Sequence, residues 1–430
     1  MCRSWHAYLE VPMLKDLLPQ SHGRYTALPL LGPVVDDFAT WLLEHGYRRG
    51  TVCVMLRPVG CVDRWLRRRG VRRLCEISAE RVQACWAALH QRESNLGGLV
   101  HALGRYLDAQ GFLRPEPPHP LAPAQRQLLA YAEHLEQLRG LSRSTVCNHL
   151  RTAAQFLEHL GHDAEPCRLR LLTASDLESF IRARARQLGR GSLQQLVAQL
   201  RGFLRFLATH AEIRWGLETQ IDTPRIYRQE QLPRALPWET VRALLQSIDR
   251  TKPVGLRDYT MLLLVATYGL RVSEIATLTL DDICWREGWL RVPRPKRGTS
   301  LVLPLTNNAG TVLLRYLRKG RPTAARFREL FLRSRAPIGP LAPTAVSMAF
   351  ERWAKRSGLE IPFHGAHCLR HSHAVHLLRG GSTLKTIGDL LGHRSAESTL
   401  VYLRLACEDL REVALSLPTA GTGPETGAGS

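Results

Sequence analysis

The sequence predicts a mainly α-helical, multidomain protein that carries a small antiparallel β-sheet in its last domain. The 430 residues are too many for one compact core, since about 150 residues per domain gives two or three domains. Only residues 288–292 and 300–305 combine apolar and β-forming side chains, and residues 293–299 between them predict a hairpin turn. Helical spacing of apolar residues recurs along most of the chain, for example at Leu128, Leu129, Ala132, Leu135 and Leu138.

Proline-rich and polar stretches divide the chain into parts. Residues 114–120 read Arg-Pro-Glu-Pro-Pro-His-Pro, the composition of a stiff linker, and a second polar stretch with prolines begins at Glu218. From these breaks we expect an N-terminal helical module at residues 1–115, a helical middle domain at 121–217, a linker at 218–236, a C-terminal domain at 237–417 and a disordered tail at 418–430.

The N-terminal module and the middle domain resemble each other in sequence. Residues 51–57 (Thr-Val-Cys-x-x-Leu-Arg) match residues 145–151, and residues 77–82 resemble residues 172–177. Each of the second pair places Ser or Thr before an acidic first turn, which predicts a helix N-cap. We therefore expect a duplication, the alternative being a chance likeness between two bundles rich in Arg, Leu and Ala.

The chain is strongly basic. It has 59 Lys and Arg against 38 Asp and Glu, a formal net charge of +21. An Arg-rich genome explains Arg in place of Lys better than it explains the excess of bases over acids. Since so basic a protein attracts polyanions, we expect nucleic acid as the partner, with a membrane surface as the alternative.

The cysteines and apolar runs favour a cytoplasmic protein without a membrane partner. The ten cysteines are scattered and no Cys-x-x-Cys pair occurs, which favours reduced thiols over disulfides or a zinc ribbon. No apolar run approaches the roughly 20 residues of a membrane span, and the N-terminus leads into no apolar signal core.

The first of three clusters in the C-terminal domain lies at residues 266–275. Apolar residues predict a helix that ends at Gly269, and a new helix begins with Arg271 at its start. Arg271 is thereby pinned to a helix end. On this signal alone, a solvated arginine is the usual interpretation of an Arg at a helix terminus.

The second cluster, residues 364–378, contains five histidines. His367, Arg370 and His371 share one helix face because they are three and four residues apart. Such a cationic face suits an anion such as phosphate, whose oxygens match the planar fork of Arg, while a solvated His/Arg face is the alternative. A metal site is disfavoured because Cys368 stands where metalloproteases have Glu.

The third cluster joins a helix end to a tyrosine. An apolar helical stripe ends at Gly392, His393 follows in the turn, and Tyr402 lies on the next helical stretch. Taken alone, Tyr402 is as well explained as a core residue.

Together the three clusters resemble the catalytic domain of tyrosine recombinases, the family of phage integrases and chromosome-dimer resolvases. The resemblance covers roughly residues 230–415 and rests on Gly-Leu-Arg-Val-Ser-Glu, then His-x-Leu-Arg-His, then Leu-Gly-His with Tyr nine residues after the His. It implies the tyrosine-recombinase catalytic fold. The middle domain resembles more loosely the family's helical, SAM-like core-binding domain.

The resemblance also implies a role for each motif residue. Tyr402 would attack a DNA phosphate and form a 3′-phosphotyrosyl bond, while Arg271 and Arg370 would clamp the non-bridging oxygens. His393 would add a hydrogen bond to the same phosphate, and His367 would accept the proton of the tyrosine.

Lys296, in the expected hairpin turn, would protonate the leaving 5′-oxygen; a backbone-contacting surface Lys is the alternative. Because the covalent bond stores the energy of the broken phosphodiester, we expect no ATP, no cofactor and no metal. Fixed cations at the equatorial oxygens stabilise the charge of an in-line attack at phosphorus.

The expected partners are double-stranded DNA recombination sites and further copies of the chain. By resemblance, the protein is a nucleoid-associated recombinase that acts as a homo-tetramer or with related recombinases, and residues 403–417 dock on a neighbouring subunit. The extra N-terminal module would contact flanking DNA or a partner subunit and fits a mobile-element integrase or transposase. Alternatives are a type IB topoisomerase, an inactive DNA-binding or assembly protein, and a regulator that only binds DNA.

Overall fold

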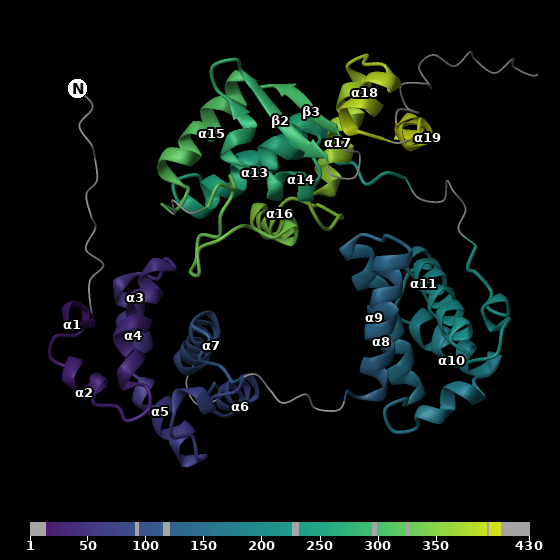
Figure 1. Cartoon of the computed structure of the whole chain (residues 1–430). Coiled ribbons are helices and arrows are strands. Elements are labelled where there is room, and N and C mark those ends of the chain that lie inside the picture. The colour runs from purple at the N-terminus through teal and green to yellow at the C-terminus, as the bar shows by residue number, and fades with distance from the viewer. Residues whose placement is uncertain are drawn as a thin grey trace, which may run out of the picture. The chain divides into compact units, whose positions relative to one another are not determined.

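The computed structural model describes residues 14–90, 94–114, 121–225, 232–294, 299–323, 327–393 and 395–405. Contacts group residues 1–115 and 232–430 in one compact unit and residues 116–231 in the other. Among the described residues helices predominate and the three-stranded sheet lies in the C-terminal domain, which confirms the predicted fold class. Figure 1 shows the helices and strands of each part.

The N-terminal module is a bundle of short helices around its own apolar core. Its largest buried side chains include Phe38 and Tyr106, whose rings lie 5.3 Å apart. The elements are α1 (Leu14–Leu17), α2 (His22–Thr26), η1 (Gly32–Val34), α3 (Val35–Glu44), α4 (Arg49–Leu56), α5 (Val59–Arg68), η2 (Leu74–Glu76), α6 (Ala79–Leu89) and α7 (Ser94–Ala109).

The middle domain has a separate core in which Phe156, Phe180 and Phe203 are fully buried. Its longest helices, α9 and α11, pack against each other. The elements are α8 (Pro123–Glu133), the π-helical η3 (His134–Leu138), α9 (Arg143–Leu160), η4 (Pro166–Leu171), α10 (Ala174–Ala185), α11 (Arg190–Thr209) and η5 (Leu217–Thr219).

The C-terminal domain builds its core around α13, which packs against α15, α16 and α17. The elements are α12 (Trp238–Gln246), α13 (Pro253–Tyr268), α14 (Val272–Thr277), η6 (Leu280–Asp282), β1 (Ile283–Cys284), β2 (Trp289–Arg294), β3 (Thr299–Pro304), α15 (Asn307–Lys319), α16 (Pro343–Ser357), α17 (His367–Arg379), α18 (Leu384–Leu391), α19 (Glu397–Leu400) and η7 (Val401–Leu405).

The sheet contains the predicted hairpin and one strand more. β2 pairs with β3 in antiparallel register, with Leu290 opposite Leu303. β1, which the sequence analysis did not anticipate, pairs with the other edge of β2. A strand of two residues is too short to show the alternation by which strands are recognised.

A buried ionic cluster ties α13 to α16. The Asp258 carboxylate is fully buried and accepts hydrogen bonds from Arg257 (2.9 Å), Arg352 and the Trp353 indole (3.0 Å). Since a buried charge is tolerated only when it is paired and hydrogen-bonded, this cluster fixes how α13 sits on α16.

No helix in the described ranges is long and apolar enough to cross a membrane. The expected disordered tail at 418–430, most of the expected docking segment at 403–417 and the hairpin turn at 295–298 lie outside the described residues.

Candidate active site

Arg271 is placed by a helix break, as the sequence predicts. α13 ends at Gly269, whose φ of 63° lies in the left-handed region that favours glycine, and Arg271 is the N-cap residue of α14. Glu274, itself buried, accepts a hydrogen bond from the Arg271 backbone at 2.8 Å and pairs with its guanidinium at 2.7 Å. The guanidinium also donates to the Gly392 carbonyl at 3.2 Å. Arg271 is therefore held from both sides.

Arg370 lies on α17 and is almost completely buried, with 2% of its surface exposed. Its guanidinium donates to the backbone carbonyls of Gly269 and Leu391. These carbonyls belong to the first residues of the other two motifs, so one arginine ties all three clusters together. The alternative of a solvated His/Arg face is wrong for this residue.

His393 lies in the turn after α18, as predicted. Gly392 ends the helix with φ of 65°, and the His393 ring nitrogen Nδ1 is 2.8 Å from the hydroxyl of Thr399. Thr399 is buried on α19, so this contact fixes the orientation of the imidazole.

Tyr402 lies in η7 with 1% of its surface exposed. Its hydroxyl is 2.9 Å from Nδ1 of His371, and its ring lies 6.1 Å from the His393 ring. Burial raises the pKa of Tyr402, although Arg370 and Arg271 oppose this effect. The phenol is therefore neutral near pH 7 and needs a base to become a nucleophile.

Two neighbouring histidines on α17 are neutral near pH 7, and one of them, His371, contacts the hydroxyl that carries this proton. The rings of His367 and His371 are 4.7 Å apart on α17. Burial lowers the pKa of His367, and the positive charges of Arg370 and Arg271 lower it further. Burial lowers the pKa of His371 to about 4, with a smaller contribution from the charge of His367. Both imidazoles are thus able to accept a proton.

The structure brings together five of the six residues expected at the site: Arg271, His367, Arg370, His393 and Tyr402. Lys296, which follows β2 and precedes β3 in the sequence, lies outside the described residues. The sequence analysis placed His371 on the right face but gave it no role, although the structure puts it against Tyr402. It also gave no role to Glu274 or Thr399.

The arrangement combines a phenol, two neutral imidazoles and two fixed guanidinium groups. Such a site can attack an anionic, tetrahedral centre, because the guanidinium groups stabilise charge on its oxygens while an imidazole takes the proton of the phenol. In the described part of the chain no group of three His, Cys, Asp or Glu is placed to hold a metal ion.

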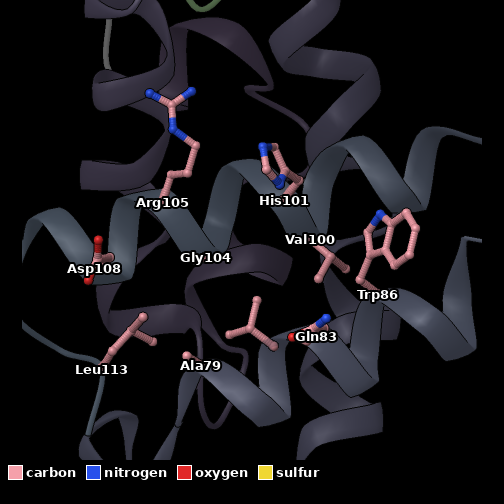
Figure 2. A pocket seen from close by; sticks show the side chains of 10 residues that line it. Ala79, Gln83, Trp86, Val100, His101, Gly104, Arg105, Asp108 and Leu113 are labelled. Atoms are coloured by element: carbon pink, nitrogen blue, oxygen red, sulfur yellow. The ribbon is translucent and has the colours of Figure 1, made fainter. Parts of the chain in front are cut away.

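A hollow in the N-terminal module is a weaker candidate. It lies between α6 and α7, where the indole of Trp86 and the side chains of His101, Arg105 and Asp108 line it (Figure 2). Its lining contains no Ser, Thr, Cys or Tyr that could act as a nucleophile. The cluster around Tyr402 is therefore the site best suited to catalysis.

Comparison with known proteins points in the same direction. The phage integrase family matches residues 234–408, and the phage integrase N-terminal SAM-like domain matches residues 128–210. The y4rA protein of Sinorhizobium fredii, named as an integrase/recombinase, is 34% identical over 399 residues, which are 91% of this chain and 96% of y4rA. Tyrosine recombinase XerD of Listeria monocytogenes is 32% identical over 279 residues, which are 64% of this chain and 92% of XerD.

A solved structure shares the fold. The XerH site-specific recombinase, bound to its difH substrate before cleavage, matches with a TM-score of 0.51 at 18% identity. The match covers 69% of this chain and 99% of XerH.

Proposed function

The chain belongs to the tyrosine recombinase, or phage integrase, family, and we propose that it cuts and rejoins DNA strands at specific sites through Tyr402. The observation that carries this proposal is the Tyr402 hydroxyl, which lies 2.9 Å from an imidazole that is neutral near pH 7, in the cluster that includes Arg271 and Arg370.

The cleavage step forms one bond and breaks one. The Tyr402 oxygen attacks the phosphorus of a DNA phosphodiester, and its proton passes to His367. The bond from phosphorus to the 5′-oxygen breaks, and Lys296 gives that oxygen a proton. The products are a 3′-phosphotyrosyl bond and a free 5′-hydroxyl, and attack by another 5′-hydroxyl reverses the step and rejoins the strands.

His371 holds the nucleophile before this step. Its Nδ1 contacts the Tyr402 hydroxyl, and the ring of His367, one turn earlier on α17, lies 4.7 Å from the His371 ring. We assign His371 as the residue that positions the phenol and His367 as the acceptor once the phenol turns toward the phosphate.

Arg271 and Arg370 stabilise the charge that builds up on the non-bridging oxygens. The carbonyls of Gly269, Leu391 and Gly392 hold both guanidinium groups in place, so little reorganisation is needed when the charge develops. His393, oriented by Thr399, adds a hydrogen bond to the same phosphate.

We propose that the reaction needs neither ATP nor a metal. The phosphotyrosyl bond keeps the energy of the phosphodiester, and the two arginines supply the positive charge that metal ions supply in other phosphoryl-transfer sites. The partner is double-stranded DNA, consistent with the net charge of +21. We further propose a homo-tetramer, or an assembly with related recombinases, that acts on two DNA sites in the bacterial cytoplasm, and a mobile-element integrase or transposase as its biological setting.

The test uses DNA from either side of the gene, made as duplexes that carry a nick so that the covalent product is trapped. We expect a detergent-resistant protein–DNA adduct that forms in the presence of a chelator. Tyr402→Phe should form no adduct, yet it should stay folded and keep its salt-dependent binding to DNA. A Tyr402→Phe protein that forms the wild-type amount of adduct would refute the proposal, and binding without any adduct in the wild type would favour an inactive DNA-binding protein.

A further inference from the structure

The N-terminal module exposes a dense group of arginines at the end of α5. We call this group the arginine cluster; its members are all exposed and are Arg64, Arg67, Arg68, Arg69, Arg72 and Arg73. Arg69 lies over the ring of Trp65 at 3.8 Å, which fixes one guanidinium of the group.

Few acids balance this charge. Asp63 is buried, and one of its carboxylate oxygens accepts hydrogen bonds from the backbone amides of Leu30 and Leu31, at 3.0 and 2.8 Å. Its other oxygen is 4.0 Å from Arg67. Glu76 lies 4.0 Å from Arg73. The arginines therefore exceed the carboxylates around them.

The arginine cluster brings like charges close together, a repulsion that a bound anion would relieve. Arg64 and Arg68 are like charges four residues apart on one helix, an arrangement that costs a few tenths of a kcal/mol. One or two cations in the last turn of α5 interact favourably with the negative end of the helix dipole. This effect falls off within that turn, so it does not explain Arg72 and Arg73, which lie beyond the helix.

Arginine-rich composition does not explain the cluster, because the middle domain has a similar order of elements without a matching group of arginines. Gly70 follows the end of α5 as Gly161 follows the end of α9, each with a positive φ, and the backbone amides of Val71 and His162 each donate to a leucine carbonyl, that of Leu66 or Leu157. In both places a short 3-10 helix and an N-capped helix follow: Ser78 caps α6, and Thr173 caps α10.

Two of the cluster's arginines have a carboxylate at the matched position of the middle domain. Counting back and forward from the two glycines, Arg67 corresponds to Glu158 and Arg72 corresponds to Asp163. All four side chains are exposed. Since both surfaces belong to one chain of one composition, the overall composition does not account for the dense positive charge at this turn of the N-terminal module.

We propose that the arginine cluster binds the phosphates of duplex DNA and makes the N-terminal module a second DNA-binding module of this protein. Guanidinium groups offer planar pairs of donors that match phosphate oxygens, and this contact carries no sequence information. The alignment with y4rA spans 91% of the chain and so includes most of this module. The inference rests on the proposed function only in that DNA is the polyanion bound.

The experiment compares the full chain with two triple variants on a long duplex of random sequence. The test variant is Arg64→Gln/Arg68→Gln/Arg72→Gln. The control is Arg315→Gln/Arg318→Gln/Lys319→Gln, which removes the same charge from exposed residues at the end of another helix, α15. We measure Kd for each protein over a range of KCl concentrations, together with Tm.

Each lost phosphate contact reduces the slope of log K against log salt by about 0.9, so the test variant should lose about 2 to 3 of slope. The control should keep the wild-type slope. The test variant should be at least as stable as the wild type because a like-charge pair is removed, which shows that the module stays folded.

Two results overturn the inference. Equal losses of slope in both variants would mean that total charge alone matters. If the test variant keeps the wild-type slope of log K against log salt but forms a smaller protein assembly than the wild type, the arginine cluster would contact a partner subunit and not DNA. In either case the adduct on Tyr402 would still form in the wild type, so the failure is distinguishable from a failure of the proposed function.

Discussion

Replacing Arg370 by Lys should lower the stability of the C-terminal domain as well as inactivate the site. Lys keeps the charge, but its single ammonium cannot reach the carbonyls of Gly269 and Leu391 as the guanidinium does. A buried acceptor left without a donor costs about 1–3 kcal/mol, so two carbonyls cost about 2–6 kcal/mol. A loss of about 3 kcal/mol lowers the Tm of a domain of this size by roughly 6–12 °C.

Arg271→Lys is the matched control. Its side chain is 38% exposed and makes one carbonyl contact, so we expect less than about 1.5 kcal/mol of destabilisation although the adduct is lost. Calorimetry of the full chain gives the unfolding temperatures, and the nicked duplex gives the adduct yield. An Arg370→Lys protein with a wild-type Tm would refute the view that Arg370 holds the three motifs together.

Three further predictions concern the domain that carries the site. Asp258→Asn leaves Arg257 and Arg352 without their buried carboxylate, so denaturant unfolding should show a loss of about 3–5 kcal/mol in the free energy of unfolding. A loss near zero would contradict the burial of this cluster. Gly269→Ala should lower Tm and adduct yield, because the left-handed backbone costs about 1–2 kcal/mol and the new Cβ would lie 2.7 Å from Leu391; unchanged values of both would contradict it. Burial lowers the pKa of His373 to about 4, whereas the unfolded value is about 6.5, so the unfolded chain binds the extra proton and stability should fall by about 3 kcal/mol from pH 6.5 to pH 4. A His373→Asn variant should lose this part of the pH dependence, and an identical slope in unfolding titrations would contradict the burial of the imidazole.

Helix ends were the most predictable part of the fold. Gly269 and Gly392 occur where apolar helical stripes stop, and both adopt the left-handed backbone that ends a helix. The hairpin was predictable from its two apolar strands. The strand β1 was not, because two residues carry no period.

The residues of the site were predictable as a set, but their contacts were not. Spacing on one helix placed His371 beside His367 and Arg370, yet nothing local indicates that residue 402 meets residue 371. The burial of Arg370 was also beyond the sequence, because a cationic helix face is normally solvated. The backbone carbonyls that hold Arg370 come from segments 101 and 21 residues away, which only the folded chain brings together.

The most direct measurement of the central claim is the chemical identity of the amino acid joined to DNA. The trapped adduct would be digested with nuclease and protease, and the peptide that carries a 3′-linked nucleotide would be sequenced by mass spectrometry. We predict that the nucleotide is attached to Tyr402 and to no other residue. Attachment to a different tyrosine, or to a serine, would contradict the assignment of the nucleophile.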